Sequence, residues 1–444
     1  MSASDPRPAA THHRSASDRG AVASVRLWGH EVGAVAEEPG SGRVVFEYAE
    51  EFRTSGLEIS PMNLPLSRRG PQTFDELGRS ASFMGLPGVL ADSLPDAFGN
   101  AIISRYFEQQ GRPQASLSPV QRLLYVGRRG MGALEFHPPT NIRVPELNAE
   151  ALEVAELVDQ ARRVIDGDTT IAIPEIMQVG ATAGGARAKG LILWDRERDR
   201  VRSGFAAPEP GEEAWLVKFD GVTPATGGHE LGKDFRPGPY GRIEYAYSKL
   251  ARRAQITMAE THLLRERDYA HFMTKRFDRI GEARLHMHSL GGLLHADFNL
   301  RQLVTYEQYF RTIQELELGF PAVLEAYRRM VFNLAARNQD DHVKNFAFLM
   351  DASGKWSLAP AFDLIHAVGG RWATTHQMRV NGKDDDFSRE DLLALGAKFN
   401  LPVDGKEVLR DVEEALAYWP QEAADTGLGK AEIERIRASF RHFA

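Results

Sequence analysis

The chain has 444 residues, of which 43% are apolar and 26% charged, and it contains no cysteine. At about 150 residues per domain this length predicts two to three domains, and the composition excludes collagen-like, disordered and coiled-coil chains. The missing cysteine excludes disulfides, zinc–thiolate sites, iron–sulfur clusters and cysteine nucleophiles, and the net charge of −7 argues against a chain whose whole surface binds nucleic acid.

The beginning of the chain divides into a tail and a mixed module. Residues 1–22 contain no Leu, Ile or aromatic side chain and therefore predict a flexible tail. The pattern then predicts a strand at Val25–Gly29 with Val44–Tyr48 as its partner. Met131–Phe136 closes this module, which we assign to residues 23–140.

The middle of the chain, residues 141–279, is rich in predicted strands. A period near 3.6 residues predicts helices at Leu147–Ile165 and Gly241–Ile256. Short apolar runs between turn residues predict three strands, at Leu191–Trp194, Trp215–Phe219 and His271–Asp278.

The remainder, residues 280–444, is mainly helical. Apolar residues at helical spacing predict helices at Leu300–Leu318, Pro321–Arg337, Asp391–Phe399, Glu407–Tyr418 and Ala431–Phe443. The sequence thus indicates an α+β fold with a mixed, β-rich N-terminal module, a sheet-rich middle and a helical C-terminal lobe. A cleft between a sheet-rich and a helical lobe is a preferred place for a ligand.

The sharpest motif is the segment Asn338–Asn345, which contains two adjacent aspartates. Asp340 and Asn345 have the Asp-x-x-x-x-Asn spacing of the kinase catalytic loop, in which the acid receives the proton of the attacking hydroxyl and the amide holds magnesium. Asp341 is one residue short of this spacing. His342 and Lys344 lie between the two and are candidates for phosphate contacts. The alternative is an acidic helix end followed by a turn.

A second carboxylate follows the motif at the right place for a metal site. Phe346–Leu358 predicts a β-hairpin, and Asp363 comes 18 residues after Asn345. Such a hairpin returns the chain beside the asparagine, and magnesium prefers one or two carboxylates together with phosphate oxygens. Asp363 can also be a helix N-cap.

A lone lysine lies on a predicted strand of the sheet-rich part. Trp215, Val217 and Phe219 alternate with Leu216 and Lys218, which therefore share the opposite face. Lys218 matches the phosphate-binding lysine of kinases, and Glu244 is a candidate ion-pair partner. The alternative is a lysine that extends from the edge of a sheet into solvent.

Two other segments carry weaker signals. Gly180–Lys189 is not a Walker A loop, but its small residues Gly184 and Gly185 would allow backbone N–H groups to approach phosphates; a plain turn is equally consistent. The histidines at 286, 288 and 295, with Asp297, contain too few ligands at metal spacing to favour a metal site.

The motifs together resemble the HipA family of bacterial toxin serine/threonine kinases, from about Val25 to the C-terminus. The resemblance lies in seven segments in the same order: Leu94–Gly99, Gly130–Leu134, Gly184–Lys189, Leu216–Phe219, Lys275–Arg279, Asp340–Asn345 and Leu358–Asp363.

The resemblance implies a two-lobed, protein-kinase-like fold and roles for individual residues. It makes Asp340 the catalytic base, Asn345 and Asp363 the magnesium ligands, and Lys218 a contact of the ATP phosphates. Lys275, Arg276 and Phe277 would form the hinge against adenine, with Lys275 in place of the usual glutamate.

The resemblance also implies regulation and partners. In this family a hydroxyl in the glycine-rich loop is autophosphorylated, which silences the kinase, and Thr182 stands where the best-known members have serine. It further implies a HipB-like helix-turn-helix antitoxin, operator DNA bound through that complex, and a protein substrate such as an aminoacyl-tRNA synthetase. Two alternatives remain: a catalytically silent nucleotide-binding partner of the antitoxin, and a kinase of small molecules or lipids.

The location of the protein is also an expectation from sequence. No stretch approaches the roughly 18 continuous apolar residues of a membrane helix, and the first residues contain no apolar core of a signal peptide. We therefore expect a cytoplasmic protein without membrane contact.

Overall fold

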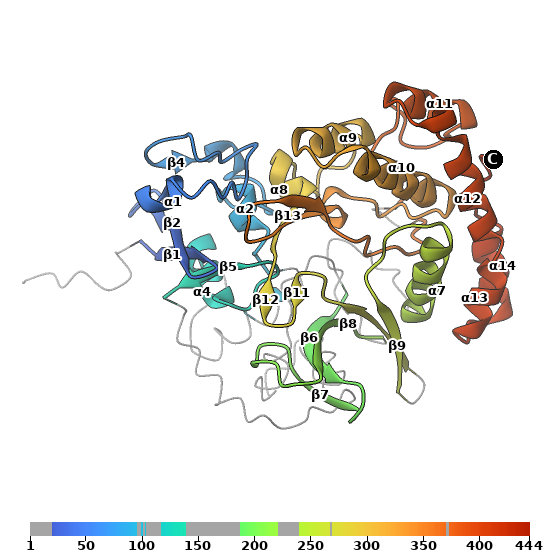
Figure 1. Ribbon diagram of the computed structural model, residues 1–444, viewed down its shortest axis with the longest axis horizontal. Coiled ribbons are helices and arrows are strands. Elements are labelled where there is room, and N and C mark those ends of the chain that lie inside the picture. Colours follow the sequence, from blue (N-terminus) through green and yellow to red (C-terminus); the bar gives the residue numbers. More distant parts are fainter. Residues whose placement is uncertain are drawn as a thin grey trace, which may run out of the picture.

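The structure is a computed structural model, and its elements follow one another from the N-terminal module at one end to the helices α11–α14 at the other (Figure 1). The structure describes residues 20–95, 99–100, 103, 117–138, 187–220, 239–266, 269–369 and 373–444. The helix predicted at 147–165 lies outside these residues.

A five-stranded antiparallel sheet forms the N-terminal module, in the order β4-β3-β2-β1-β5. Its strands are β1 (Val22–Leu27), β2 (His30–Glu37), β3 (Val44–Tyr48), β4 (Gln72–Thr73) and β5 (Leu134–His137). Both predicted strands exist, but their predicted pairing is wrong, because β2 lies between β1 and β3. Trp28 and Gly29 both have positive φ, of 50° and 84°, which closes a tight hairpin directly after β1.

Short helices cover this sheet, and one hydrophobic core fills the module. The helices are α1 (Glu50–Arg53), α2 (Gly88–Ala91) and α4 (Pro119–Val126), and a 3-10 turn spans Asp75–Leu77. Met350 and Trp356, which come from the far end of the chain, also pack into this core. The N-terminal module is therefore joined to the C-terminal lobe by shared apolar contacts.

A second five-stranded antiparallel sheet has the order β7-β6-β8-β10-β9. Its strands are β6 (Lys189–Asp195), β7 (Arg200–Ser203), β8 (Glu212–Lys218), β9 (Thr261–Glu266) and β10 (Tyr269–Lys275). The predicted strands at 191–194, 215–219 and 271–278 correspond to β6, β8 and β10. Helix α7 (Tyr240–Arg253) confirms the helix predicted at 241–256 and contacts β9 and β10.

A three-stranded sheet links this part to the helical lobe, in the order β13-β14-β15. Its strands are β13 (His286–Ser289), β14 (Ala347–Met350) and β15 (Trp356–Leu358), and β14 and β15 form the predicted hairpin. Two short strands, β11 (Arg279–Ile280) and β12 (Ala283–Arg284), precede it, and α8 (Leu290–Leu294) follows β13.

The C-terminal helices form the largest hydrophobic core. They are α9 (Tyr306–Glu315), α10 (Phe320–Ala335), α11 (Arg389–Lys398), α12 (Lys406–Leu416), α13 (Trp419–Asp425) and α14 (Lys430–Arg437). The helix predicted from Leu300 begins only at Tyr306, because Thr305 is its N-cap and forms a capping box with Gln308. Helix α13 was not predicted, and α14 ends at Arg437 rather than Phe443.

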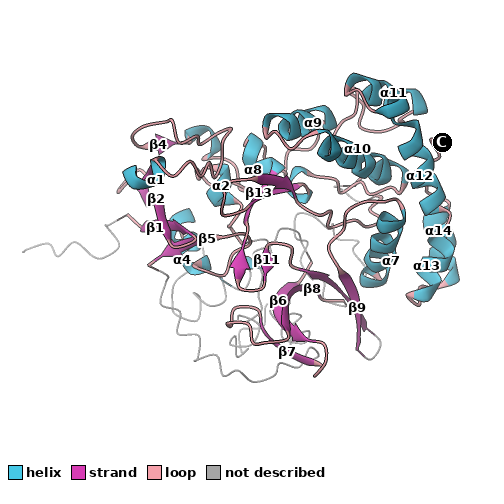
Figure 2. Cartoon of the chain, viewed as in Figure 1, coloured by secondary structure: helices cyan, strands magenta, loops and turns pink. Residues whose placement is uncertain are grey.

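The predicted α+β class is confirmed: helices α7 and α9–α14 gather on one side, and most strands lie on the other (Figure 2). Within the described ranges, no helix is long and apolar enough to cross a membrane.

Candidate functional site

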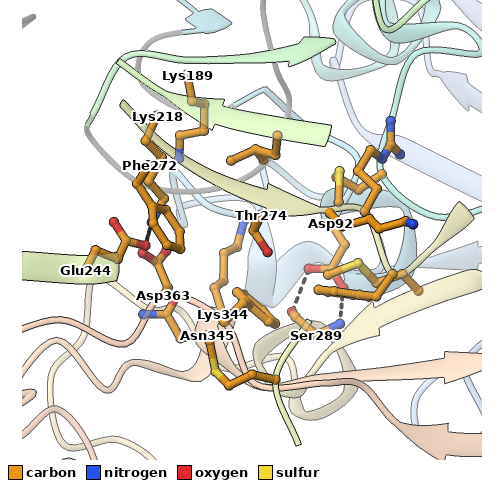
Figure 3. Close-up of a pocket in the computed structure, with 18 of the residues that line it drawn as sticks. Asp92, Lys189, Lys218, Glu244, Phe272, Thr274, Ser289, Lys344, Asn345 and Asp363 are labelled. Carbon is orange, nitrogen blue, oxygen red and sulfur yellow. Dashed lines mark hydrogen bonds and ion pairs between the residues drawn. The ribbon is translucent and has the colours of Figure 1, made fainter. Parts of the chain in front are cut away.

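One pocket is lined by residues from all three parts of the chain. Its lining includes Lys189, Leu216, Lys218 and Phe272 from the second sheet, Asn345, Phe362 and Asp363 from the C-terminal lobe, and Met131 and Leu134 from the N-terminal module. Figure 3 shows Lys218, Glu244 and Asp363 together at one side of this pocket. Residues far apart in sequence therefore meet around one space.

Lys218 is the centre of a buried ion-pair cluster. Its ammonium donates to Glu244 Oε1 at 2.6 Å and also contacts the Asp363 carboxylate. Burial works to lower the pKa of Lys218, but the negative charges of Asp363 and Glu244 outweigh it and raise the pKa. The ammonium is therefore charged, and the predicted Lys218–Glu244 pair is present.

Glu244 is fixed from two sides. It lies on α7 and its side chain is 1% exposed. Besides Lys218 it accepts a hydrogen bond from Arg187 Nη1 at 2.8 Å. Two cations therefore hold this carboxylate and, through it, orient the ammonium of Lys218 toward the pocket.

Asp363 follows β15 in a left-handed backbone conformation, with a φ of 57°. Such a φ is uncommon for a residue other than glycine and often marks a functional site. Burial works to raise the pKa of Asp363, but the positive charges of Lys218 and Lys189 outweigh it and lower the pKa to about 2. The carboxylate is therefore ionised at neutral pH and able to bind a cation.

Asn345 and Asp340 are joined by a hydrogen bond. Asn345 ends a 3-10 turn over Val343–Asn345, and its Nδ2 donates to the carbonyl oxygen of Asp340 at 2.8 Å. Because this hydrogen bond uses the amide nitrogen of Asn345, the amide oxygen Oδ1 is the atom that can bind a cation in the pocket that Asn345 lines. The predicted loop geometry thus brings both residues next to Asp363.

The two adjacent aspartates have different environments. Asp341 is buried and accepts hydrogen bonds from Tyr306 at 2.7 Å and from the backbone N–H of Gln377 at 2.8 Å, and it pairs with His376 at 3.0 Å. The side chain of Asp340 is 49% exposed. Of the two carboxylates, Asp340 is therefore the one that a substrate can reach.

The environment of Asp340 favours a proton acceptor. Although its side chain is half exposed, the surrounding protein removes much of its hydration. This desolvation, followed by the negative charges of Asp363 and Asp341, raises the pKa of Asp340 to about 7. A carboxylate with such a pKa can both take up and release a proton near neutral pH.

The two basic residues of the Asn338–Asn345 segment, His342 and Lys344, lie in different places. Lys344 lines the pocket, and its ammonium is 5.2 Å from the ring centroid of Phe298. His342 does not line the pocket. Its ring packs against Phe298, with 5.3 Å between centroids, and its Nε2 lies 4.0 Å from Asp340 Oδ1. Lys344 is therefore placed to meet a ligand in the pocket, and His342 lies beside the carboxylate.

The predicted hinge, Lys275–Phe277, also lines the pocket. The ammonium of Lys275 pairs with Glu213, and the guanidinium of Arg276 pairs with Asp278 at 2.6 Å. The ring of Phe277 lies 5.5 Å from that of Phe362. The charged ends of Lys275 and Arg276 thus have protein partners, and their backbone N–H groups donate to Glu260 O and Ala214 O. The ring of Phe277 is therefore the part of the predicted hinge that can face a flat ligand.

Three buried residues behind the hinge form what we call the arginine clamp: Arg276, Asp278 and Arg279. The Asp278 carboxylate is 0% exposed and receives Arg276 and Arg279 at 2.6 Å each. It also accepts the backbone N–H of Gly132 at 2.7 Å. The clamp therefore fastens the hinge to the N-terminal module.

The remaining predicted residues fall into two groups. Thr182, Gly184 and Gly185 lie outside the described residues. His286, His288 and His295 have protein partners: Ile59 O, Asp92 and the backbone N–H of Gly88. Within the described residues, no three acidic, histidine or cysteine side chains are placed to hold a metal ion together.

Sequence reasoning missed several residues of the pocket. Lys189 is buried and pairs directly opposite Lys218 across β6 and β8, so two lysines share one face. Its place in the Gly180–Lys189 segment was a signal for this role. Asp92, Ser93, Met131 and Ser289 also line the pocket. Of these, only Met131 lies in a segment of the family resemblance, Gly130–Leu134, and no role in a site was predicted for it.

Comparisons with known proteins agree with this architecture. The family profile described as the HipA-like C-terminal domain matches residues 181–419, and that of the HipA N-terminal domain matches residues 23–137. No curated protein sequence matches the chain.

Two solved structures match the chain to different degrees. The Shewanella oneidensis MR-1 toxin–antitoxin complex of HipA, HipB and operator DNA matches with a TM-score of 0.64 and 17% identity, over 94% of this chain and 95% of that chain. The Helicobacter pylori proinflammatory kinase CtkA matches with a TM-score of 0.32 and 13% identity, over 51% of this chain and 85% of that chain. The first match shows a shared fold, and the second is too low to do so.

Proposed function

The chain belongs to the HipA family, and from this premise we propose that it is an ATP- and magnesium-dependent protein serine/threonine kinase. One observation carries the proposal. Lys218, Asp363 and Asn345 come from distant segments and line one pocket, and the backbone carbonyl of Asp340 accepts a hydrogen bond from Asn345. Phosphoryl transfer needs this set of groups: a cation for the phosphates, oxygen ligands for magnesium, and a base for the acceptor hydroxyl.

The phosphates would bind at the side of the pocket that carries the lysines. Lys218 is held by Glu244 at 2.6 Å, as in the lysine–glutamate pair of protein kinases. Lys189 lies opposite Lys218, and Lys344 lines the same pocket. Three ammonium groups would thus compensate much of the charge of a triphosphate.

The oxygen atoms that the pocket offers fit a magnesium ion. Asp363 is ionised, and the amide oxygen of Asn345 is available because the amide nitrogen binds Asp340 O. Two such protein ligands, completed by phosphate oxygens and water, suit magnesium. When bound, the ion would neutralise charge on the phosphates. Both residues would orient the terminal phosphate toward Asp340.

Asp340 would act as the base. Its side chain is 49% exposed, so a serine or threonine hydroxyl can approach the carboxylate. Asp340 would orient this hydroxyl and take up its proton while the phosphate is transferred. Asp341 would hold the loop in place through its buried hydrogen bonds to Tyr306 and Gln377.

Regulation and partners follow from family membership as further parts of the proposal. We propose that Thr182 is autophosphorylated and that this modification silences the kinase. The similar Shewanella oneidensis HipA is known in a complex with HipB and operator DNA. We propose a HipB-like helix-turn-helix antitoxin and operator DNA as partners, and a cytoplasmic protein such as an aminoacyl-tRNA synthetase as substrate.

The test is incubation of the purified chain with labelled ATP, with and without magnesium. We expect label on the chain itself, at Thr182 by mass spectrometry, and none without the metal. Asp340→Asn should abolish labelling, because the amide cannot accept the proton. Asp386→Asn, which changes an exposed aspartate, is the matched control and should label normally.

Two outcomes would contradict the proposal. If the wild type binds ATP but transfers label neither to itself nor to an added protein, the chain is a silent nucleotide-binding partner and not a kinase. If Asp340→Asn labels as fast as the wild type, the base has been misassigned.

A further inference from the structure

The N-terminal module supplies one wall of the pocket. Asp92, Ser93, Met131 and Leu134 line it although they lie outside the kinase-like part of the chain. In Figure 3, Asp92 is on the opposite side of the pocket from Lys218. The module therefore borders the side of the pocket away from Lys218 and Lys189.

Met131 is held in the wall by the turn on which it lies. Gly132 has a φ of 75°, and a Cβ at this position would lie 2.9 Å from the backbone nitrogen of Met287. No other side chain fits so close an approach, and the positive φ also favours glycine. The turn thus packs directly on β13 of the C-terminal lobe.

The arginine clamp fixes the same turn through its backbone. Arg279 donates to the carbonyl oxygens of Gly130 at 3.2 Å and Gly132 at 3.0 Å, and Asp278 accepts the N–H of Gly132 at 2.7 Å. Because these contacts hold both neighbours of Met131, the position of its backbone is defined before any ligand binds.

The surroundings of Met131 are apolar. It packs against Leu191 and Leu216 of the second sheet. Leu216 shares a face of β8 with Lys218, two residues further along the strand, so the apolar and the charged parts of the pocket adjoin. A nucleotide has the same polarity: charged phosphates at one end and a flat base with apolar faces at the other.

We propose that Met131 contacts the base of the bound nucleotide, so that the N-terminal module forms part of the nucleotide site. The inference rests on the proposed function, because it takes ATP as the ligand. With phosphates near Lys218 and Lys189, the base lies in the apolar part between the hinge and the module. There Met131 supplies a flexible thioether side chain that adapts to a flat ring.

The experiment measures binding of two probes to the full chain by calorimetry: magnesium–ATP and inorganic tripolyphosphate, which has no base. Met131→Ala should weaken ATP binding by about three- to tenfold, because buried apolar contact is lost, and leave tripolyphosphate binding unchanged. Lys218→Met should weaken the binding of both ATP and tripolyphosphate. Met84→Ala is the matched control: Met84 packs on the core of the same module and does not line the pocket. It should change neither.

The outcomes separate this inference from the proposed function. If the wild type binds ATP and Met131→Ala binds it equally well, only the role of Met131 is refuted and the proposed function stands. If Met131→Ala loses affinity for both probes equally, the role of Met131 is also refuted, because the residue would then act through the fold. Met131→Leu has a similar side-chain volume and should keep ATP affinity within about twofold of the wild type. Wild type that binds no ATP refutes both proposals.

Discussion

Two buried charge clusters lie close together in this protein and differ in one respect. The arginine clamp is closed: every partner of the Asp278 carboxylate belongs to the protein, and the carboxylate is 0% exposed. Both clusters reach the pocket, through Arg276 and Lys218, but the carboxylate of Asp363 in the Lys218 cluster belongs to a side chain that is 26% exposed. Charges that the protein satisfies completely hold parts together, whereas charges that face a cavity are available to a ligand.

The largest expected effect on the difference between the two clusters is a loss of activity in Asp363→Asn. Asp363→Asn removes the charge that we propose as a magnesium ligand but keeps the shape of the side chain. We expect phosphoryl transfer to fall by at least about 10³-fold, with little change in the melting temperature. Initial rates with labelled ATP and a thermal melt measure the two effects. A variant that retains a tenth of the wild-type rate would show that Asp363 is not a metal ligand.

Asp278→Asn should have the reverse pattern. Removing this charge leaves Arg276 and Arg279 buried without their counter-ion, and breaking such a group costs about 3–5 kcal/mol of the free energy of unfolding. Denaturant titration measures the loss. Asp75→Asn, which breaks an exposed pair with Arg43, is the control and should cost far less, because water screens exposed charges. Equal losses in both variants would argue against a structural role for the clamp.

Lys218→Met tests the cluster from its cationic side. The thioether keeps much of the side-chain volume but cannot pair with phosphate, so we expect ATP affinity to fall by about ten- to 100-fold. Calorimetry measures the affinity. Lys355→Met, at the exposed turn between β14 and β15, is the control and should bind ATP as the wild type does. Unchanged binding in Lys218→Met would place the phosphates elsewhere.

The last expected effect is a pH dependence, which needs no substitution. The pKa of Asp340 is raised to about 7, and a carboxyl accepts a proton only when it is ionised. The rate should therefore rise with pH, about tenfold per unit below the pKa, and level off above it. ATP binding should change little between about pH 5 and about pH 8, because the pKa of Asp363 is about 2. A flat rate over this range would contradict the role of Asp340.

The sequence predicts the local parts of this structure better than their assembly. Strand β8, the hairpin of β14 and β15, and the spacing of Asp340 and Asn345 follow from patterns within a few residues. The partner of β1 was predicted wrongly because the chain turns back within two residues at Trp28, and β2 pairs with β1 directly after this turn. Helix α9 began later than expected because an N-cap at Thr305 outweighs the apolar period before it.

The wall formed by the N-terminal module was beyond sequence reasoning for a physical reason. The contacts that fix Met131 use the backbone N–H and C=O groups of Gly130 and Gly132, and backbone groups look alike at every position. Their partners, Asp278 and Arg279, lie about 150 residues away in the chain. Only the folded structure shows that these segments meet.

Trp356 has a consequence for how the molecule unfolds. Its side chain packs against the core of the N-terminal module and also against the core of the C-terminal helices. Neither core can loosen on heating without exposing this indole, so the two lose their order together. We therefore expect calorimetry to show one cooperative transition instead of two, and tryptophan fluorescence to follow the same curve.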